Sequence, residues 1–130
     1  LVGSEMCIRD RHSAMQKEEC NTCCIHSSMT SEERHEALSE FKAGRYRVLI
    51  SSNVTARGID VQQVSIVINF DIPKCVHNYL HRIGRSGRWG RKGVAINFIT
   101  RDDISTLKRI ESHYKTNIHE LPTTFESHIV

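Results

Sequence analysis

The stretch SIVINFDIPKCVHNYLHRI, residues 65–83, decides the fold class of this chain. Its apolar run at 66–68 is unbroken, which predicts a strand covered on both faces, as strands of parallel sheets are. After Pro73, apolar residues recur at the spacing of one helix face: Val76, Tyr79, Leu80 and Ile83. A buried strand followed by an amphipathic helix is the repeating unit of a parallel α/β sheet.

The same alternation continues upstream. Residues 22–25 and 47–51 read as strands, and between them Thr30 and Glu33 form a capping-box sequence that predicts the start of a helix. Gly44 is expected to end this helix. Its apolar face consists of Ala37, Leu38 and Phe41.

The alternation also continues downstream. Residues 93–99 predict a further strand, and Thr100 with Asp103 predicts a cap before a helix that runs to about Tyr114. The inner face of that helix is expected to hold Ile104, Leu107 and Ile110. We therefore predict an α/β domain of three layers with a mostly parallel sheet.

Composition is that of one soluble globular domain. The chain has 130 residues, of which 38% are hydrophobic and 25% charged, and its net charge is +3. We expect no membrane association, because no apolar run approaches the roughly 20 residues that cross a bilayer. Positive charge gathers at residues 82–92.

The five cysteines form an odd set with no secretory leader before them, which favours a reduced, cytoplasmic or nuclear location. Cys20 and Cys23 have the spacing of half a zinc site, but no second pair stands at ligand spacing. We predict no metal site, and we interpret Cys23 and Cys24 as residues of a buried strand.

The start of the chain differs from the rest. Leu1–Arg11 (LVGSEMCIRDR) shows no helical or strand periodicity and begins on Leu instead of Met. We expect residues 1–19 to be disordered or foreign to the domain, the domain itself to span residues 20–122, and residues 123–130 to form a tail.

The segment HRIGRSGRWGRK, residues 81–92, places arginines three apart between glycines. Arginine offers a rigid fork of donors, and glycine lets backbone N–H groups approach an anion. A solvated basic face is the alternative. The regular glycine spacing favours a polyphosphate contact, since a soluble surface gains nothing from it.

A second segment, SSNVTARGID at residues 51–60, directly follows a predicted strand. Its hydroxyls, arginine and carboxylate suit a phosphodiester on one side and a sugar hydroxyl on the other. Ligands of parallel sheets gather at the carboxyl ends of the strands. The architecture can therefore bring both segments to one edge of the sheet.

The order of these motifs resembles the C-terminal RecA-like lobe of DEAD-box RNA helicases. The resemblance covers roughly residues 20–122, and the segments at 93–98 and 114–122 are most similar to eukaryotic translation initiation factor 4A and its close nuclear relatives. It rests on residues 25–26, Arg34, 56–60, 69–73 and 81–88. The family implies an amino-terminal lobe and a first strand of this lobe, both of which we expect to lie outside these residues.

The resemblance implies an ATP side. Arg85 and Arg88 would reach the γ-phosphate, one of them as an arginine finger, while Gly58, Asp60 and His81 would belong to the nucleotide site. ATP with Mg²⁺ would be held mainly by the other lobe, because the phosphate-loop and Asp-Glu-Ala-Asp sequences are absent here. Asp60 as a turn carboxylate and His81 as a helix-terminal histidine are the structural alternatives.

The resemblance also implies an RNA side, with sequence-independent contacts to the backbone of a single strand. The implied residues are His26, Ser27, Arg34, Ser52, Arg57 and Gly58. For Arg34, an ion pair with Glu33 or Glu36 is the alternative. Three positions depart from the family pattern on this side, namely Ser27, Ser31 and Asn53.

The function implied is that of a helicase lobe contributing to RNA-stimulated ATP hydrolysis and duplex unwinding. Its expected partners are RNA, the amino-terminal lobe, and translation-initiation or RNA-processing factors. We expect these 130 residues alone to be inactive. The alternative is a non-catalytic RNA- or protein-binding module derived from such a lobe, which the departures at Ser27, Ser31 and Asn53 would permit.

Overall fold

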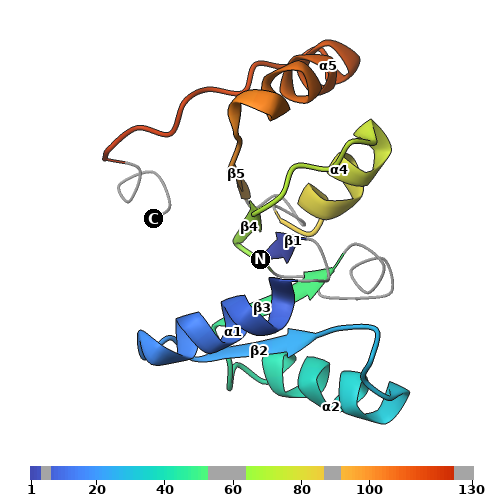
Figure 1. Ribbon diagram of the computed structural model, residues 1–130, viewed down its shortest axis with the longest axis vertical. Coiled ribbons are helices and arrows are strands. Elements are labelled where there is room, and N and C mark those ends of the chain that lie inside the picture. Colours follow the sequence, from blue (N-terminus) through green and yellow to red (C-terminus); the bar gives the residue numbers. More distant parts are fainter. Residues whose placement is uncertain (4–6, 53–63, 87–91, 125–130) are drawn as a thin grey trace.

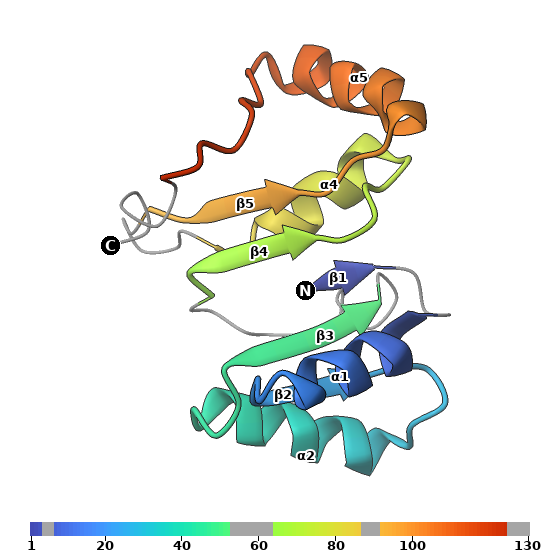
Figure 2. The same cartoon turned by 60° about the vertical axis from the view of Figure 1, so that its left-hand side comes forward.

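The computed structural model of the chain describes residues 1–3, 7–52, 64–86 and 92–124. Strands and helices alternate along it, as Figures 1 and 2 show. In chain order the elements are β1 (Val2–Gly3), α1 (Ile8–Lys17), β2 (Thr22–Ile25), α2 (Ser31–Lys42), β3 (Val48–Ser52), β4 (Ile66–Asn69), α4 (Val76–Ile83), β5 (Val94–Asn97), the 3₁₀ turn η2 (Arg101–Asp103) and α5 (Ile104–Tyr114).

The strands form one parallel sheet of five strands in the order β2-β3-β1-β4-β5. One row of paired residues crosses all of them: Ile25, Ser51, Val2, Asn69 and Asn97. Residues in one row of a parallel sheet point to the same face. The predicted parallel α/β fold is confirmed, and this row locates its main polar feature.

Helices cover both faces of the sheet, which gives the predicted layers. On β2, Thr22 bonds His12 of α1, with 2.8 Å between Oγ1 and Nδ1. Ile25, whose side chain points to the opposite face, packs against Ala37, Leu38 and Phe41 of α2. Helices α1 and α2 therefore lie on opposite faces.

Helix α4 lies on the face that α2 covers, because it contacts Asn69, which shares a row with Ile25. Helix α5 packs against α4 through a cluster centred on the buried Ile72, Tyr79 and Ile110. Figure 2 shows α4 beginning near the arrowhead of β4 and running back along that strand.

The expectation of disorder within residues 1–19 is wrong for the part that the structure describes. β1 lies in the middle of the sheet and α1 packs on β2 and β3, with Val2 9% and Ile8 0% exposed. Hydrophobic periodicity did not reveal these two elements, because a strand of two residues has no repeat and Ile8 is the buried residue of α1. Whether Leu1–Arg11 is foreign to the domain, and where the domain begins, stay predictions.

The predicted helix signals are largely confirmed. Glu33 N–H donates to Thr30 Oγ1 at 3.2 Å and Thr30 N–H donates to the Glu33 carboxylate at 2.8 Å, which is the expected capping box. Gly44 follows α2 at φ +79°. Thr100 and Asp103 also form a capping box, which opens η2 ahead of α5.

Two apolar residues assigned to inner helix faces are exposed. Leu80 is 51% and Ile104 44% exposed. The buried face of α4 is narrow and follows Val76, Tyr79 and Ile83, so Leu80 lies on its flank. Ile104 opens α5 one turn before Leu107, which is the first residue of α5 in the cluster. Among the described residues, no helix has the length and apolar character to span a membrane.

Candidate functional site

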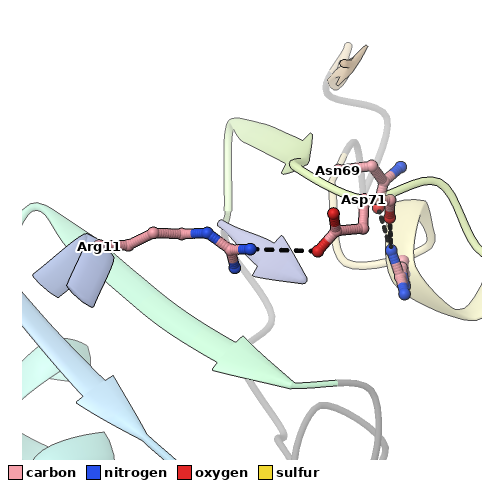
Figure 3. Close-up of polar contacts among 4 residues, drawn as sticks. Arg11, Asn69 and Asp71 are labelled. Carbon is pink, nitrogen blue, oxygen red and sulfur yellow. Dashed lines mark hydrogen bonds and ion pairs between the residues drawn. The ribbon is translucent and has the colours of Figure 1, made fainter. Parts of the chain in front are cut away.

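A buried arginine fastens α4 to the end of β4. Arg82 is 6% exposed, and its Nη1 donates to Asn69 Oδ1 at 3.3 Å and to the carbonyl of Asp71. Figure 3 shows Asn69 and Asp71 side by side at this point. Burial lowers the pKa of Arg82 and the nearby Asp71 opposes that shift. The guanidinium stays charged, and its hydrogen bonds hold α4 against the end of β4.

Two more side chains extend this contact into a chain of hydrogen bonds that returns to α4. Asn69, 0% exposed, donates from Nδ2 to Asn97 Oδ1 of β5 at 2.8 Å. Asn97 Nδ2 then donates to the hydroxyl of Tyr79 at 3.2 Å. Tyr79 and Arg82 lie one turn apart on α4, so the helix is tied to two strands at once. We call Arg82, Asn69, Asn97 and Tyr79 the α4 clamp.

Asp71 is also held from the other face. Arg11 of α1 forms an ion pair with its carboxylate at 3.1 Å, drawn as a dashed line in Figure 3. The Arg11 guanidinium lies 3.9 Å from the ring centre of Phe70. The residues that follow β4 are thus held by arginines of α1 and α4.

Arg85 follows the clamped helix after one residue, the C-cap Gly84. The C-cap Gly84 N–H bonds the carbonyl of Leu80 at 2.8 Å, and a Cβ at Gly84 would stand 2.9 Å from that carbonyl oxygen. Such a contact requires the backbone to move, so glycine is needed here. Ser86, one residue beyond Arg85, forms a parallel bridge with Val64.

Arg85 is half-buried and, within the residues that the structure describes, forms no ion pair. Its donors are therefore available to an anion. Together with Arg82 it lines a cavity of about 630 Å³ between β3 and β4, whose other walls include Val48, Leu49, Ile66 and Val67. His81, one turn earlier than Arg85, is exposed. The residues of the predicted nucleotide side that are described thus share one end of α4.

The predicted RNA side lies at the carboxyl ends of β2 and β3. His26 and Ser27 follow β2 directly, and Ser52 ends β3. Ser27 is exposed, whereas Ser52 is only 3% exposed. Arg34 is half-buried in the first turns of α2, and no ion pair joins it to Glu33 or Glu36 in the described part of the chain.

The described residues test only in part the expectation that both segments reach one edge of the sheet, and Ser51 of the first segment and Arg85 of the second line the same cavity. Because α4 runs back along β4, Ser86 lies beside Val64, before β4 begins, while Ser52 and His26 lie where β3 and β2 end. Arg57, Gly58, Asp60 and Arg88 lie outside the described residues, so their roles stay predictions.

Sequence reasoning missed the α4 clamp. Asn69 and Asn97 each end a strand after three apolar residues and are paired in register. An asparagine at the same place in two neighbouring buried strands is the signal that could have indicated a polar contact between the sheet and its covering helix.

The cysteines of β2 are strand residues, as interpreted. Burial raises the pKa of Cys23 to about 11, with the neighbouring Cys24 adding to the shift. Burial also raises the pKa of Cys24. In the parts of the chain that are described, no three His, Cys, Asp or Glu residues are grouped so that they could hold a metal ion.

The parallel five-stranded sheet with helices on both faces defines the class as a RecA-like α/β lobe. The family described as "Helicase conserved C-terminal domain" matches residues 4–90, starting before the predicted boundary at residue 20. In shape, the chain resembles the C-terminal domain of the DEAD-box protein Dbp5, with a TM-score of 0.86, 34% identity, and coverage of 94% of this chain and 72% of that one.

Similarity to curated relatives shows which helicases within the family the chain resembles. The chain is 57% identical over 108 residues to the ATP-dependent RNA helicase FAL1 of Yarrowia lipolytica and 55% identical over 106 residues to a probable eukaryotic initiation factor 4A of Trypanosoma brucei brucei. These matches cover 83% and 82% of this chain, but only 27% and 26% of the relatives. The chain belongs to the helicase C-terminal domains of DEAD-box RNA helicases and is similar to initiation factor 4A.

A structure of S. cerevisiae Dbp5 bound to RNA and ADP BeF3 matches with a TM-score of 0.87 and 31% identity. That match covers 98% of this chain and 35% of the other. The chain thus spans about a quarter of the curated relatives and a third of a ligand-bound neighbour.

Proposed function

We propose that this chain is the C-terminal lobe of an ATP-dependent RNA helicase, and that it offers Arg85 and Arg88 to a nucleotide held mainly by another lobe. The observation that carries the proposal is the position of Arg85 and the lack of an ion pair to it among the described residues. Arg85 follows a helix clamped by buried hydrogen bonds. An arginine kept unpaired and well placed is suited to charge that develops during a reaction.

The described residues fit ATP through this arginine. Phosphoryl transfer is catalysed mostly by positioning and charge, and an arginine finger is worth about 10³ to 10⁵ in rate in related nucleotide hydrolases. When bound with Mg²⁺, ATP supplies the phosphoryl group that is transferred to water. Arg85 would hold positive charge near that group, and the fixed end of α4 would keep it there.

RNA is proposed to contact His26, Ser27, Arg34 and Ser52, where β2 and β3 end. Arg57 and Gly58, which lie outside the described residues, are proposed to contact RNA as well. Among the described residues, Ser86 lies beside Val64, before β4 begins, whereas Ser52 ends β3. Gly58 is proposed to take part on both the nucleotide side and the RNA side. RNA-processing or translation-initiation factors in the cytoplasm or nucleus are the proposed partners.

The test uses a full-length protein in which this chain replaces the matched region of the Y. lipolytica relative. We expect RNA-stimulated ATP hydrolysis, and we expect Arg85→Ala to lower kcat by about 10³, as loss of a finger does. Binding of ATP should change by less than about ten-fold, since most of the nucleotide would be held by the other lobe.

Arg101→Ala is the matched control, because Arg101 is also an arginine but is exposed on η2. Its turnover should equal that of the parent protein. An Arg85→Ala protein with parental kcat would remove the finger assignment. A parent protein that binds RNA but never hydrolyses ATP would favour the alternative, a non-catalytic RNA-binding module.

A further inference from the structure

We propose that Asn97 and Tyr79 are positioning residues for Arg85, acting through Asn69 and Arg82. The inference rests on the proposed function, because it concerns how the nucleotide-facing arginine is held. Neither residue lies within the arginine-glycine segment, and neither is expected to touch a ligand.

The position of Arg85 depends on the last turn of α4. This helix has eight residues, and Gly84, which has no side chain to anchor, stands between it and Arg85. In the described residues, Arg82 is the side chain that joins this turn to β4 by hydrogen bonds. Any rotation of Arg82 about the helix axis would therefore be passed on to Arg85 three residues later.

The apolar contacts of α4 do not fix that rotation by themselves. Val76, Tyr79 and Ile83 pack in a cluster with residues of α5. Apolar packing is non-directional, so neighbouring arrangements of such a face differ little in energy. Hydrogen bonds have preferred distances and angles, and they are stronger in a buried site than in water.

Asn97 supplies the directional restraint. It accepts a hydrogen bond from Asn69 Nδ2 at 2.8 Å, which turns Asn69 Oδ1 toward Arg82. It also donates to Tyr79 at 3.2 Å, and so it ties β5 to the turn of α4 that precedes Arg82. Without Asn97, the fully buried Asn69 would lose the partner that orients it.

The experiment measures turnover in the full-length protein described above. We expect Asn97→Leu to lower kcat by about ten-fold with KM for ATP changed less than about two-fold, since a 1 Å misplacement can cost about 10²-fold. Tyr79→Phe removes only the hydroxyl, and we expect a loss of about three-fold, as for one neutral hydrogen bond.

Asn97→Asp is the conservative variant. A carboxylate can still accept from Asn69 Nδ2, and the hydroxyl of Tyr79 can reverse and donate to it. We expect Asn97→Asp to recover most of the turnover that Asn97→Leu loses. Failure to recover it would overturn the proposal, because lost packing would then explain the defect.

Tyr114→Phe is the matched control for Tyr79→Phe. Its hydroxyl also bonds α4, at the carbonyl of Val76, but at the start of the helix and 2.7 Å from that oxygen. The same atom is removed, so stability should fall by a similar amount while kcat stays parental. Equal losses of kcat in both variants would show a merely structural role and overturn the proposal.

A spectroscopic readout separates this proposal from the proposed function. In the parent protein, the Arg82 guanidinium protons should exchange slowly with water in NMR spectra, and Asn97→Leu should speed that exchange more than ten-fold. Unchanged exchange overturns the proposal whatever the activity. A parent protein without RNA-stimulated turnover overturns the proposed function and the positioning role together, even where the exchange result holds.

Discussion

The sheet has two halves that are held together by different forces. Strands β2 and β3 with helices α1 and α2, here the β2–β3 half, rest mainly on apolar contacts around Ile8, Ile25 and Ile50. A side-chain hydrogen bond between Thr22 and His12 joins α1 to this half of the sheet. Strands β4 and β5 with helices α4 and α5, the β4–β5 half, have an apolar cluster between the helices. They add the α4 clamp between helix and sheet.

The difference follows the predicted roles of the halves. The β2–β3 half is predicted to carry backbone contacts for RNA, and such contacts need a stable support but little angular precision. The β4–β5 half carries Arg85, whose task depends on its placement within fractions of an ångström. Apolar burial provides stability, and the buried hydrogen bonds provide a single arrangement.

Ile50→Ala is expected to break the β2–β3 half. Ile50 is 0% exposed, and removal of a buried Ile side chain costs about 2–5 kcal/mol. Chemical denaturation should show this loss in the free energy of unfolding. Exchange of the Arg82 guanidinium protons in the folded state should remain slow, and faster exchange would show that the halves are not independent.

Asn69→Leu is expected to break the β4–β5 half at a cost of about 1–3 kcal/mol, because Arg82 loses a buried acceptor. Adding Arg82→Met should cost less than Arg82→Met costs in the parent protein, since the hydrogen bond between the two side chains is already lost. All free energies come from denaturation curves. Losses that simply add in the double variant would contradict a coupling between Asn69 and Arg82.

The pH dependence of stability should differ between the halves through Cys23. Its pKa is raised from 9.0 to about 11 in the folded chain, so the unfolded chain ionises first and stability falls as pH rises from 9 to 11. At pH 10 the loss should be about 1 kcal/mol, since one pKa unit corresponds to about 1.4 kcal/mol.

Cys23→Ala should reduce this slope in denaturation curves taken between pH 8 and pH 11, and the raised pKa of Cys24 should leave a smaller slope of the same sign. Cys75→Ala is its control, because Cys75 is exposed and lies in the β4–β5 half. The same slope in the Cys23→Ala protein as in the parent would show that another group titrates.

Local signals in the sequence predicted most of the fold. The strand at 22–25 is reproduced residue for residue, and Thr30, Glu33, Thr100 and Asp103 cap their helices as expected. These features depend on neighbours in the chain, which a sequence displays directly. The motif order was equally local, and it identified the family correctly.

Features that depend on distant partners escaped prediction. Val2 and Ile8 are buried by strands and helices far along the chain, so their own neighbours gave no pattern. The return of α4 along β4 places Ser86 beside Val64, before β4 begins, which the spacing of the two motifs did not show. The clamp joins residues 69, 79, 82 and 97 from three elements and is visible only once the strands are in register.

The α4 clamp also has a polarity. A guanidinium can only donate, so Asn69 must turn its oxygen to Arg82 and its nitrogen to Asn97. Asn97 must then turn its nitrogen to Tyr79, whose hydroxyl oxygen accepts this hydrogen bond. The Arg82 cation thus selects one of two orientations for each of the two side-chain amides. Replacing Arg82 with an uncharged side chain would remove that selection, so both orientations of Asn69 and Asn97 would become available.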